Sequence, residues 1–352
     1  MLLSENIDPI EHRAAMRAKN AAESANAITF AEATEKFIAA REGEWRNPKH
    51  RQQWENTLAT YCAPINQMHV GLIDTPAVLR CLEPDWATKT ETASRVRGRI
   101  EQVLDWCTVR GYRKGENPAR WRGHLDKLLS APKKIKKSTH QPAIPWAAMP
   151  AFMQRLRTEQ DGVAARCLEF VALTGVRSGE ARGMQWREID TDEAVWVVPA
   201  SRTKRNRQHR VPLSPQALRI IEKMPKQAGS PLVFTSSRGG ELSDMSLTAV
   251  LRRMHEAQPI PCDAPGRAPT AHGMRSALRD WAFEATTHAR EVVEATLSHV
   301  TGDATELAYK RGDALERRRA LLAEWADFLD KPKQPAKVAN IGAARAKRKA
   351  AA

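Results

Sequence analysis

The stretch HGMRSALRDWAFEATTHAREVVEATLSHVTGDATELAYKR, residues 272–311, contains the side chains around which the rest of the chain is organised. His272 and Arg275 are three residues apart and would share one face of a helix. His299 follows in LSH, and Tyr309 follows in LAYKR. A guanidinium binds two phosphate oxygens at once, imidazoles donate hydrogen bonds, and a phenol can attack phosphorus. The stretch therefore suits a phosphodiester better than a metal ion or a nucleotide cofactor, and we expect neither metal nor cofactor.

The composition indicates a polyanionic partner. The chain has 352 residues, enough for about two domains, and it carries 56 Lys and Arg against 41 Asp and Glu, a net charge of +15. A protein this basic most often meets nucleic acid, and the alternative is a basic protein without such a partner. Five single cysteines without a CxxC motif indicate reduced thiols rather than a disulfide frame or zinc site.

The sequence predicts a soluble, cytoplasmic protein. No apolar run approaches the ~18–20 residues of a membrane span. The N-terminal MLLSENIDPIEHR is unlike a signal peptide.

The first half of the chain reads as helical. Residues 1–27 are polar and Ala-rich, which predicts a helical arm or linker. Residues 28–130 predict an all-α bundle, because apolar residues recur with a helical period and no strand signal interrupts them. Expected helix starts in this bundle are Asn47-Pro48, Thr75-Pro76, a Thr88/Glu91 capping box and Asn117-Pro118. Residues 131–145 (APKKIKKSTHQPAIP), rich in proline and lysine, predict a basic linker that does not pack.

The second half predicts an α+β domain over residues 146–331, so the fold class is mainly α with a small β-hairpin or sheet. The β-branched stretches 194–198 and 211–213 flank the basic RTKRNRQHR, which indicates a hairpin with a basic tip. Ser214-Pro215 would begin a helix. Further helices are expected at 244–256, 271–285, 290–298, 304–309 and 313–328. The basic tail, residues 332–352, is expected to be disordered.

Phosphoryl transfer without a metal needs rigid donors around oxygens that gain charge. Arg177 and Arg275 offer planar, permanently charged forks, and His299 offers a further donor. Tyr309, the only tyrosine after residue 112, would attack phosphorus, and Lys204 at the hairpin tip would protonate the leaving sugar oxygen. Each residue taken alone also has a purely structural explanation. A lone arginine is usually a surface residue, His299 could be a buried structural histidine, and Tyr309 could belong to the core.

Four segments bear a family resemblance when taken together: TGVRSGEARGMQWREID (174–190), RTKRNRQHRVPLS (202–214), AHGMR (271–275) and LSHVTGDATELAYKR (297–311). In order and spacing they resemble the motifs of the tyrosine recombinases, the phage-type integrases. The resemblance is strong over residues 146–329. It is fair over 28–130, which is similar to the helical core-binding domain that completes a clamp on DNA.

The resemblance implies catalytic roles and partners. It makes Glu180 the acidic companion of the first arginine, and the implied catalytic residues are Arg177, Lys204, His272, Arg275, His299 and Tyr309. The implied partners are double-stranded DNA at a core site and three further copies of the chain in a tetramer, with an excisionase and a DNA-bending host factor as candidate accessory proteins. Cleavage would pass through a 3′-phosphotyrosine link and a Holliday junction, integrating or excising a mobile element.

Two further expectations come from the ends of the chain. LLSENIDPIEHR resembles the join that follows an arm-type DNA-binding domain in phage and genomic-island integrases, so we expect that domain to be missing. The helix after Tyr309 has an apolar stripe, and in this family such a helix often docks on a neighbouring protomer, which predicts exchange in trans. The alternative functions are a degenerate integrase that only binds DNA and a topoisomerase of type IB.

Overall fold

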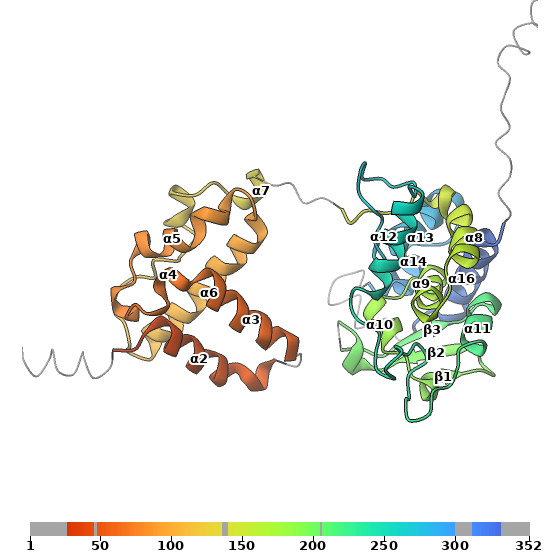
Figure 1. The fold of residues 1–352 in the computed structure, drawn as a ribbon, viewed down its shortest axis with the longest axis horizontal. Helices are drawn as coiled ribbons and strands as arrows, with labels where there is room; N and C mark the ends of the chain where they lie inside the picture. The colour runs from red at the N-terminus through yellow and green to blue at the C-terminus, as the bar shows by residue number, and fades with distance from the viewer. Residues whose placement is uncertain (1–26, 46–47, 136–139, 205, 300–311, 332–352) are drawn as a thin grey trace, which may run out of the picture. The chain divides into compact units, whose positions relative to one another are not determined.

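The computed structural model describes residues 27–45, 48–135, 140–204, 206–299 and 312–331 (Figure 1). The chain splits into two compact units, with the division between Thr139 and His140. This division lies inside the predicted 131–145 linker, while the finer domain limits stay predictions. The predicted tail and 304–309 helix, and all of the predicted arm except Ala27, lie outside the described residues.

The first unit is built from helices, as predicted for this half of the chain. Its helices in chain order are α2 (Phe30–Arg41), η2 (Glu42–Glu44), α3 (Pro48–Tyr61), α4 (Ala63–Asn66), η3 (Val70–Leu72), α5 (Thr75–Trp86), α6 (Thr90–Val109), η4 (Leu125–Lys127) and α7 (Pro132–Ile135). The long α6 packs against α2, α3 and α5, and its apolar face lies in the hydrophobic core of the first unit. In the same unit the Trp86 and Trp121 rings stack, with their centroids 5.6 Å apart.

Some predicted helix starts in this unit are wrong. Asp74, not Thr75, caps α5, because its carboxylate accepts from the Ala77 N–H at 2.9 Å. Thr88 does not cap α6, which begins after Lys89 without a side-chain cap. Asn117 does not begin a helix either, since its side chain instead bonds the Glu101 carbonyl and holds the following residues in turns.

The second unit combines helices with a small sheet. Its elements are η5 (Trp146–Ala148), α8 (Met149–Glu159), α9 (Val163–Thr174), α10 (Ser178–Arg182), η6 (Trp186–Glu188), β1 (Ile189–Asp190), β2 (Val195–Val198), η7 (Ala200–Arg202), β3 (His209–Pro212), α11 (Pro215–Glu222), α12 (Ser246–Ala257), α13 (Gly273–Ala285), α14 (Arg290–Thr296) and α16 (Leu315–Leu329). The predicted fold class, mainly α with a small sheet, is confirmed. No helix in the described part of the chain has the length and apolarity to cross a bilayer.

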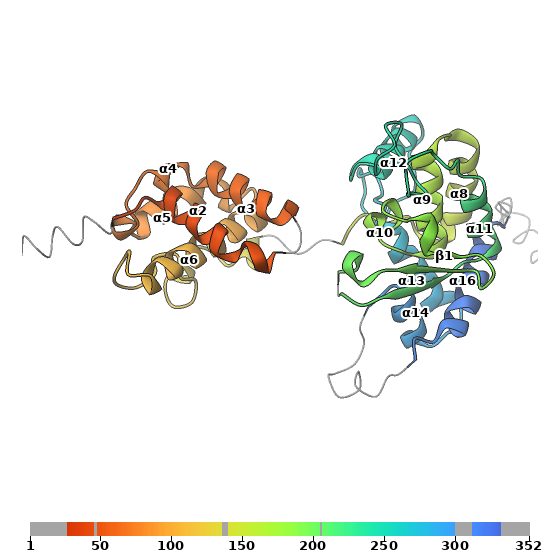
Figure 2. The same ribbon diagram turned by 90° about the horizontal axis from the view of Figure 1, so that it is seen from below.

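The sheet has the order β1-β2-β3 and is antiparallel throughout. Strands β2 and β3 pair in the register Val195 to Pro212 and Val198 to His209, as expected for the predicted hairpin. The sheet lies at one edge of the unit, with the helices stacked on one side of it (Figures 1 and 2). As predicted, Ser214 caps α11, and its hydroxyl accepts from the Ala217 N–H at 3.3 Å.

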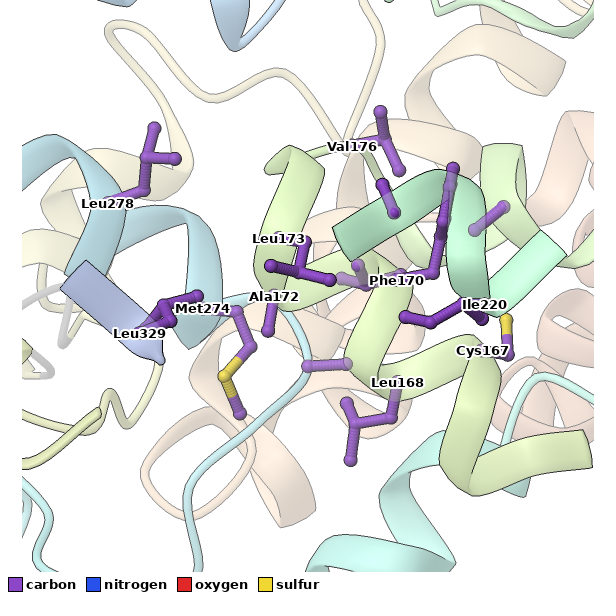
Figure 3. Packing of buried hydrophobic residues seen from close by; sticks show 14 of the residues in the cluster. Cys167, Leu168, Phe170, Ala172, Leu173, Val176, Ile220, Met274, Leu278 and Leu329 are labelled. Carbon is purple, nitrogen blue, oxygen red and sulfur yellow. The ribbon is translucent and has the colours of Figure 1, made fainter. Parts of the chain in front are cut away.

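Helix α9 forms the centre of this unit's core. Nine of its residues are buried, so it is covered on nearly every side (Figure 3). The centroid of the Phe170 ring lies 5.6 Å from that of Phe234 and 5.8 Å from that of Trp196 on β2. Elements α8, α10, α11, α12, α13 and α16 all contact α9. The C-terminal end of α9 is therefore a fixed point for the residues that follow it.

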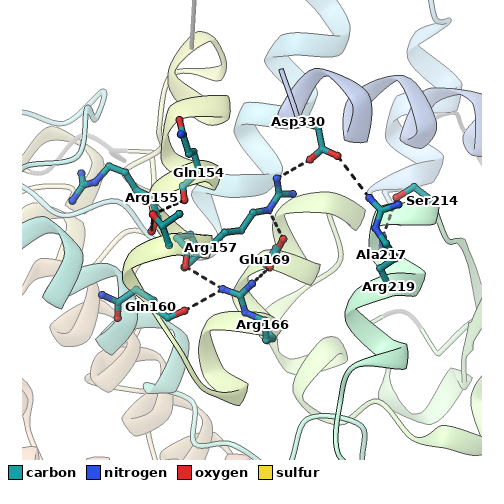
Figure 4. A network of polar contacts seen from close by, with 12 residues as sticks. Gln154, Arg155, Arg157, Gln160, Arg166, Glu169, Ser214, Ala217, Arg219 and Asp330 are labelled. Carbon is teal, nitrogen blue, oxygen red and sulfur yellow. Dashed lines mark hydrogen bonds and ion pairs between the residues drawn. The ribbon is translucent and has the colours of Figure 1, made fainter. Parts of the chain in front are cut away.

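The last helix packs within its own unit, and its docking on a neighbouring protomer stays a prediction. The apolar stripe of α16 packs into the core of its own unit, with Leu321 and Trp325 fully buried. The Trp325 indole N–H donates to the Ala172 carbonyl at 2.8 Å. A charged network fastens the end of the helix: Arg157 bonds Asp330 at 2.7 Å and the buried Glu169 at 2.6 Å (Figure 4). Apolar surface on α8 and α9 therefore covers the stripe within its own unit.

This arrangement predicts the effect of shortening Leu321. We expect Leu321→Ala to lower the free energy of unfolding of the second unit by about 2–5 kcal/mol, the usual cost of emptying a core leucine site. Urea unfolding of the full chain at two protein concentrations about tenfold apart should give the same loss. Leu72→Ala, at a leucine that is 69% exposed, should change stability by less than about 0.5 kcal/mol. A loss that depended on concentration would place the helix on a second chain after all.

The end of the predicted linker packs, contrary to expectation. Ala143 and Ile144 are buried in the second unit. The Ala143 N–H donates to the Asp263 carboxylate at 2.8 Å, and the Thr270 N–H donates to the Pro142 carbonyl at 3.0 Å. An apolar pair with satisfied backbone groups can pack even beside prolines and lysines. This segment lies directly on Gly273, where a Cβ would approach the Pro142 carbonyl oxygen to 2.3 Å.

Gly273→Ala should consequently be destabilising at a helix position where alanine normally stabilises. The new methyl group meets the Pro142–Ala143 backbone, so we expect a loss of about 1–3 kcal/mol, typical of overpacking. Thermal unfolding measures it, with Gly240→Ala as the control, because a Cβ there meets its nearest atom at an ordinary 3.9 Å. Equal stability of the two variants would contradict the close approach.

Candidate active site

Arg275 occupies the centre of the candidate site. It lies in the first turn of α13 and is only 4% exposed. Its Nη1 donates to the Gly175 carbonyl, and its Nη2 donates to the Leu297 carbonyl at 2.5 Å. The same Nη2 lies 3.1 Å from Nε2 of His299. Its Nε is buried without a partner among the described residues. The guanidinium therefore joins the ends of α9 and α14 and retains donor capacity.

Two left-handed turns place the carbonyls that hold Arg275. Gly175 ends α9 with φ +65°, and a Cβ there would meet Leu297 at 3.2 Å. Glycine is required because it alone combines this conformation with such close packing. Ser298 follows α14 with φ +53°, a conformation that costs a non-glycine residue roughly 1–2 kcal/mol. The turn presents the Leu297 and Ser298 carbonyls to the site and places His299 beyond them.

Arg177 reaches the same turn from α10. Its backbone N–H and its Nη1 both bond the Glu180 carboxylate, at 3.0 Å and 2.9 Å. Its Nη2 donates to the Ser298 carbonyl at 3.4 Å. Glu180 is 4% exposed, so the ion pair is shielded from water on the carboxylate side. This is the geometry of an acidic companion that orients an arginine.

The site has more positive charge than its carboxylates balance. Burial, followed by the charge of Arg177, lowers the pKa of Arg275 to about 10, while Glu180 and Glu294 oppose the shift. Two arginines that repel each other in a partly desolvated place favour an anion between them. The electrostatics therefore fit the binding of a phosphate group.

His272 and Lys204 border this cluster. His272 precedes α13, is exposed, and makes no capping bond with its ring. Burial lowers its pKa, and so do the charges of Arg275, Arg177, His299 and Lys204. Lys204 is exposed on the turn of the β2–β3 hairpin. The Thr203 hydroxyl closes that turn by bonding the Ala200 and Arg207 carbonyls at 3.0 Å and 2.8 Å.

The structure thus brings Arg177, Arg275 and His299 into direct contact through one turn and places His272 and Lys204 beside them. Tyr309 lies outside the described residues. Among the residues that are described, no three His, Cys, Asp or Glu side chains gather as a metal site would require. The catalytic roles of all six residues stay predictions.

Comparison with known proteins identifies the family. A model of the phage integrase family matches residues 146–314, and a model of the phage integrase central domain matches residues 30–124. Together the two matches span most of both units, and all six predicted residues, with Lys204 and Tyr309 among them, lie in the range 146–314. The chain belongs to the phage integrase family.

Curated relatives carry the same family name. Prophage integrase IntA of Escherichia coli K12 is 28% identical over 94% of this chain and 76% of its own length. The integrase of enterobacteria phage P4 is 27% identical over 94% of this chain and 74% of its own length. Both similarities run through the two units.

Solved structures show the same fold at low sequence identity. A lambda integrase (75–356) dimer bound to a COC′ core site has a TM-score of 0.61 at 16% identity and covers 78% of this chain and 96% of its own. The Tn1549 transposon integrase in complex with a circular intermediate DNA has a TM-score of 0.59 at 11% identity, covering 84% and 99%. The fold of this integrase is therefore that of the lambda and Tn1549 enzymes.

Sequence reasoning missed two residues next to the site, His209 and Glu294. His209 lies on β3, is 9% exposed, and has a pKa of about 4 because burial and the charges of Arg318, Arg177 and Arg275 disfavour its protonated form. Glu294 lies on α14 with its carboxylate 2.7 Å from Nδ1 of His299. His209 lies two residues before the apolar Val211, so the period-two alternation of a strand was a signal that both point inward. No local signal distinguished Glu294 from the other acids of α14.

The buried His209 predicts a pH dependence of stability. The unfolded chain binds a proton on this ring below about pH 6.5, whereas the folded chain does so only below about pH 4. Stability is therefore full above pH 6.5 and falls as the pH drops from 6.5 to 4, by about 3 kcal/mol for this ring. His209→Gln cannot titrate and should flatten that part of the profile, measured by hydrogen exchange in β2 and β3.

His140→Gln removes an exposed histidine of the same unit and serves as the control. It should keep the slope of the unaltered integrase. An unchanged slope in His209→Gln would show that His209 is not held neutral in the folded protein.

Proposed function

We propose that this integrase is a site-specific DNA recombinase that cuts and rejoins duplex DNA through a phosphotyrosine link. The observation that carries the proposal is the cationic cluster around one turn: Arg275 fixed between two carbonyls, with Arg177 and His299 on the same turn. These donors are rigid before any substrate arrives, as stabilisation of a charged transition state requires.

Double-stranded DNA is the proposed substrate. The net charge of +15 favours a polyanion, and the solved relatives include lambda integrase as a dimer on a core site and as a tetramer on a Holliday junction. The same assembly is proposed for this chain: four copies on two duplexes, acting in the cytoplasm on a mobile element. An excisionase and a DNA-bending protein would set its direction.

The proposed step exchanges one ester bond for another. The Tyr309 oxygen forms a bond to phosphorus as the bond from phosphorus to the 5′ oxygen breaks. The phenol gives its proton to solvent water, and the leaving 5′ oxygen gains one from Lys204, which water then reprotonates. Arg177, Arg275 and His299 bind the non-bridging oxygens, whose charge grows in the transition state. The phosphotyrosine link is still a phosphodiester, so a 5′-hydroxyl of a partner strand can attack it without ATP.

Covalent trapping tests the proposal. The integrase is incubated with a suicide duplex of the element's own core site, nicked near the cleavage point so that the freed strand diffuses away. On a denaturing gel we expect a shifted protein–DNA band, because the phosphotyrosine link survives denaturation. Tyr309→Phe lacks the nucleophile and should abolish that band while binding the duplex normally in a mobility shift.

Tyr112→Phe, in the first unit, is the matched control and should keep the band. Normal binding without a covalent band in the unaltered integrase would indicate a degenerate, DNA-binding protein. A covalent band with relaxation of supercoiled DNA that lacks a core site would indicate a topoisomerase of type IB.

A further inference from the structure

Glu294 is a buried carboxylate directly behind the candidate site. It lies on α14 and is 5% exposed. One carboxylate oxygen accepts from Arg279 Nε at 2.9 Å, and the other lies 2.7 Å from Nδ1 of His299. Its backbone carbonyl also accepts the His299 N–H at 2.8 Å. Main chain and side chain of one residue thus hold the same histidine.

These contacts fix the proton on the His299 ring. Burial would raise the pKa of Glu294, but hydrogen bonds from His299 and Arg279 outweigh it and leave the pKa below its ordinary value. An ionised carboxylate only accepts, so Nδ1 of His299 carries a hydrogen. Arg275 only donates, so Nε2 at 3.1 Å accepts from it while the site is empty. Nε2 is then the nitrogen that faces the site.

The other groups near His299 are basic. Arg275 contacts the ring from α13, and Arg279 of the same helix bonds the Glu294 carboxylate beside it. Arg177 contacts the carbonyl of the preceding residue, and His272 interacts electrostatically with His299. Among the described residues, Glu294 supplies the carboxylate that contacts the ring, at 2.7 Å.

We propose that Glu294 is the positioning residue for His299: its carboxylate fixes the ring with Nε2 toward the scissile phosphate and stabilises the imidazolium that donates to a non-bridging oxygen. The inference rests on the proposed strand transfer, because it assigns the source of one donor in that reaction. Glu294 itself does not touch the phosphate. A carboxylate behind a histidine acts in this way in metal sites and in hydrolases.

The test is the pH profile of covalent cleavage by full-length Glu294→Gln. The amide keeps the shape and an acceptor oxygen but lacks the charge. We expect cleavage at neutral pH to fall by roughly 10–100-fold, with the loss shrinking as the pH is lowered and the imidazolium forms without help. DNA binding should stay unchanged. Glu291→Gln, an exposed acid on the same helix, should behave like the unaltered integrase.

A second variant separates positioning from a general structural role. If Glu294 acts through His299, adding Glu294→Gln to His299→Gln should cost nothing further. Equal losses with and without His299, or a loss that is the same at every pH, would overturn the proposal. Nitrogen NMR of the His299 ring in the free protein should show the hydrogen on Nδ1, and a hydrogen on Nε2 instead would also overturn it.

The same experiment distinguishes the two levels of proposal. If the unaltered integrase forms no covalent complex, the proposed function fails, and the inference falls with it. If it does form one, and Glu294→Gln matches it at every pH, only the inference about Glu294 fails.

Discussion

The site depends on one buried guanidinium. Arg275 is anchored by the carbonyls of Gly175 and Leu297, so the C-terminal ends of α9 and α14 meet at a single side chain. Helix α9 is covered on nearly every side by the core, and this fixes one of the two carbonyls. The other is presented by the left-handed Ser298 turn, which also brings Arg177 and His299. Removing Arg275 would leave helix-end carbonyls without a donor in a buried place, which costs about 1–3 kcal/mol for each group.

The charges around this guanidinium follow a simple division. Glu180 bonds Arg177, and Glu294 bonds Nδ1 of His299, the ring nitrogen opposite the one that lies against Arg275. His209, buried nearby, has a lowered pKa and stays neutral, so it adds no further charge. An anion bound among these groups would relieve the repulsion between them. The cationic groups are therefore held close together before a phosphate binds, and binding reduces their mutual repulsion. This is a form of preorganisation.

The sequence predicted the helices and strands better than the residues and surfaces that each one contacts. Proline after a polar residue correctly marked Ser214 as the cap of α11. At α5 the same pattern pointed to Thr75, but the cap is Asp74. Only the folded geometry decides which of two adjacent polar residues reaches the free N–H groups. The stripe on α16 showed that this helix packs, but periodicity cannot tell one chain from another. The motifs located Arg177, Arg275 and His299 because their spacing is distinctive. His209 and Glu294 escaped because their importance arises from burial, which depends on residues far away in the chain.

The anchoring of Arg275 by main-chain carbonyls has a consequence for sequence drift. A backbone oxygen is present whatever side chain its residue carries, so substitutions along α9 and α14 leave this pair of acceptors in place as long as the helices end where they do. The constraint falls on backbone conformation, at Gly175 above all, rather than on side-chain chemistry. A site held in this way tolerates extensive replacement of its surroundings.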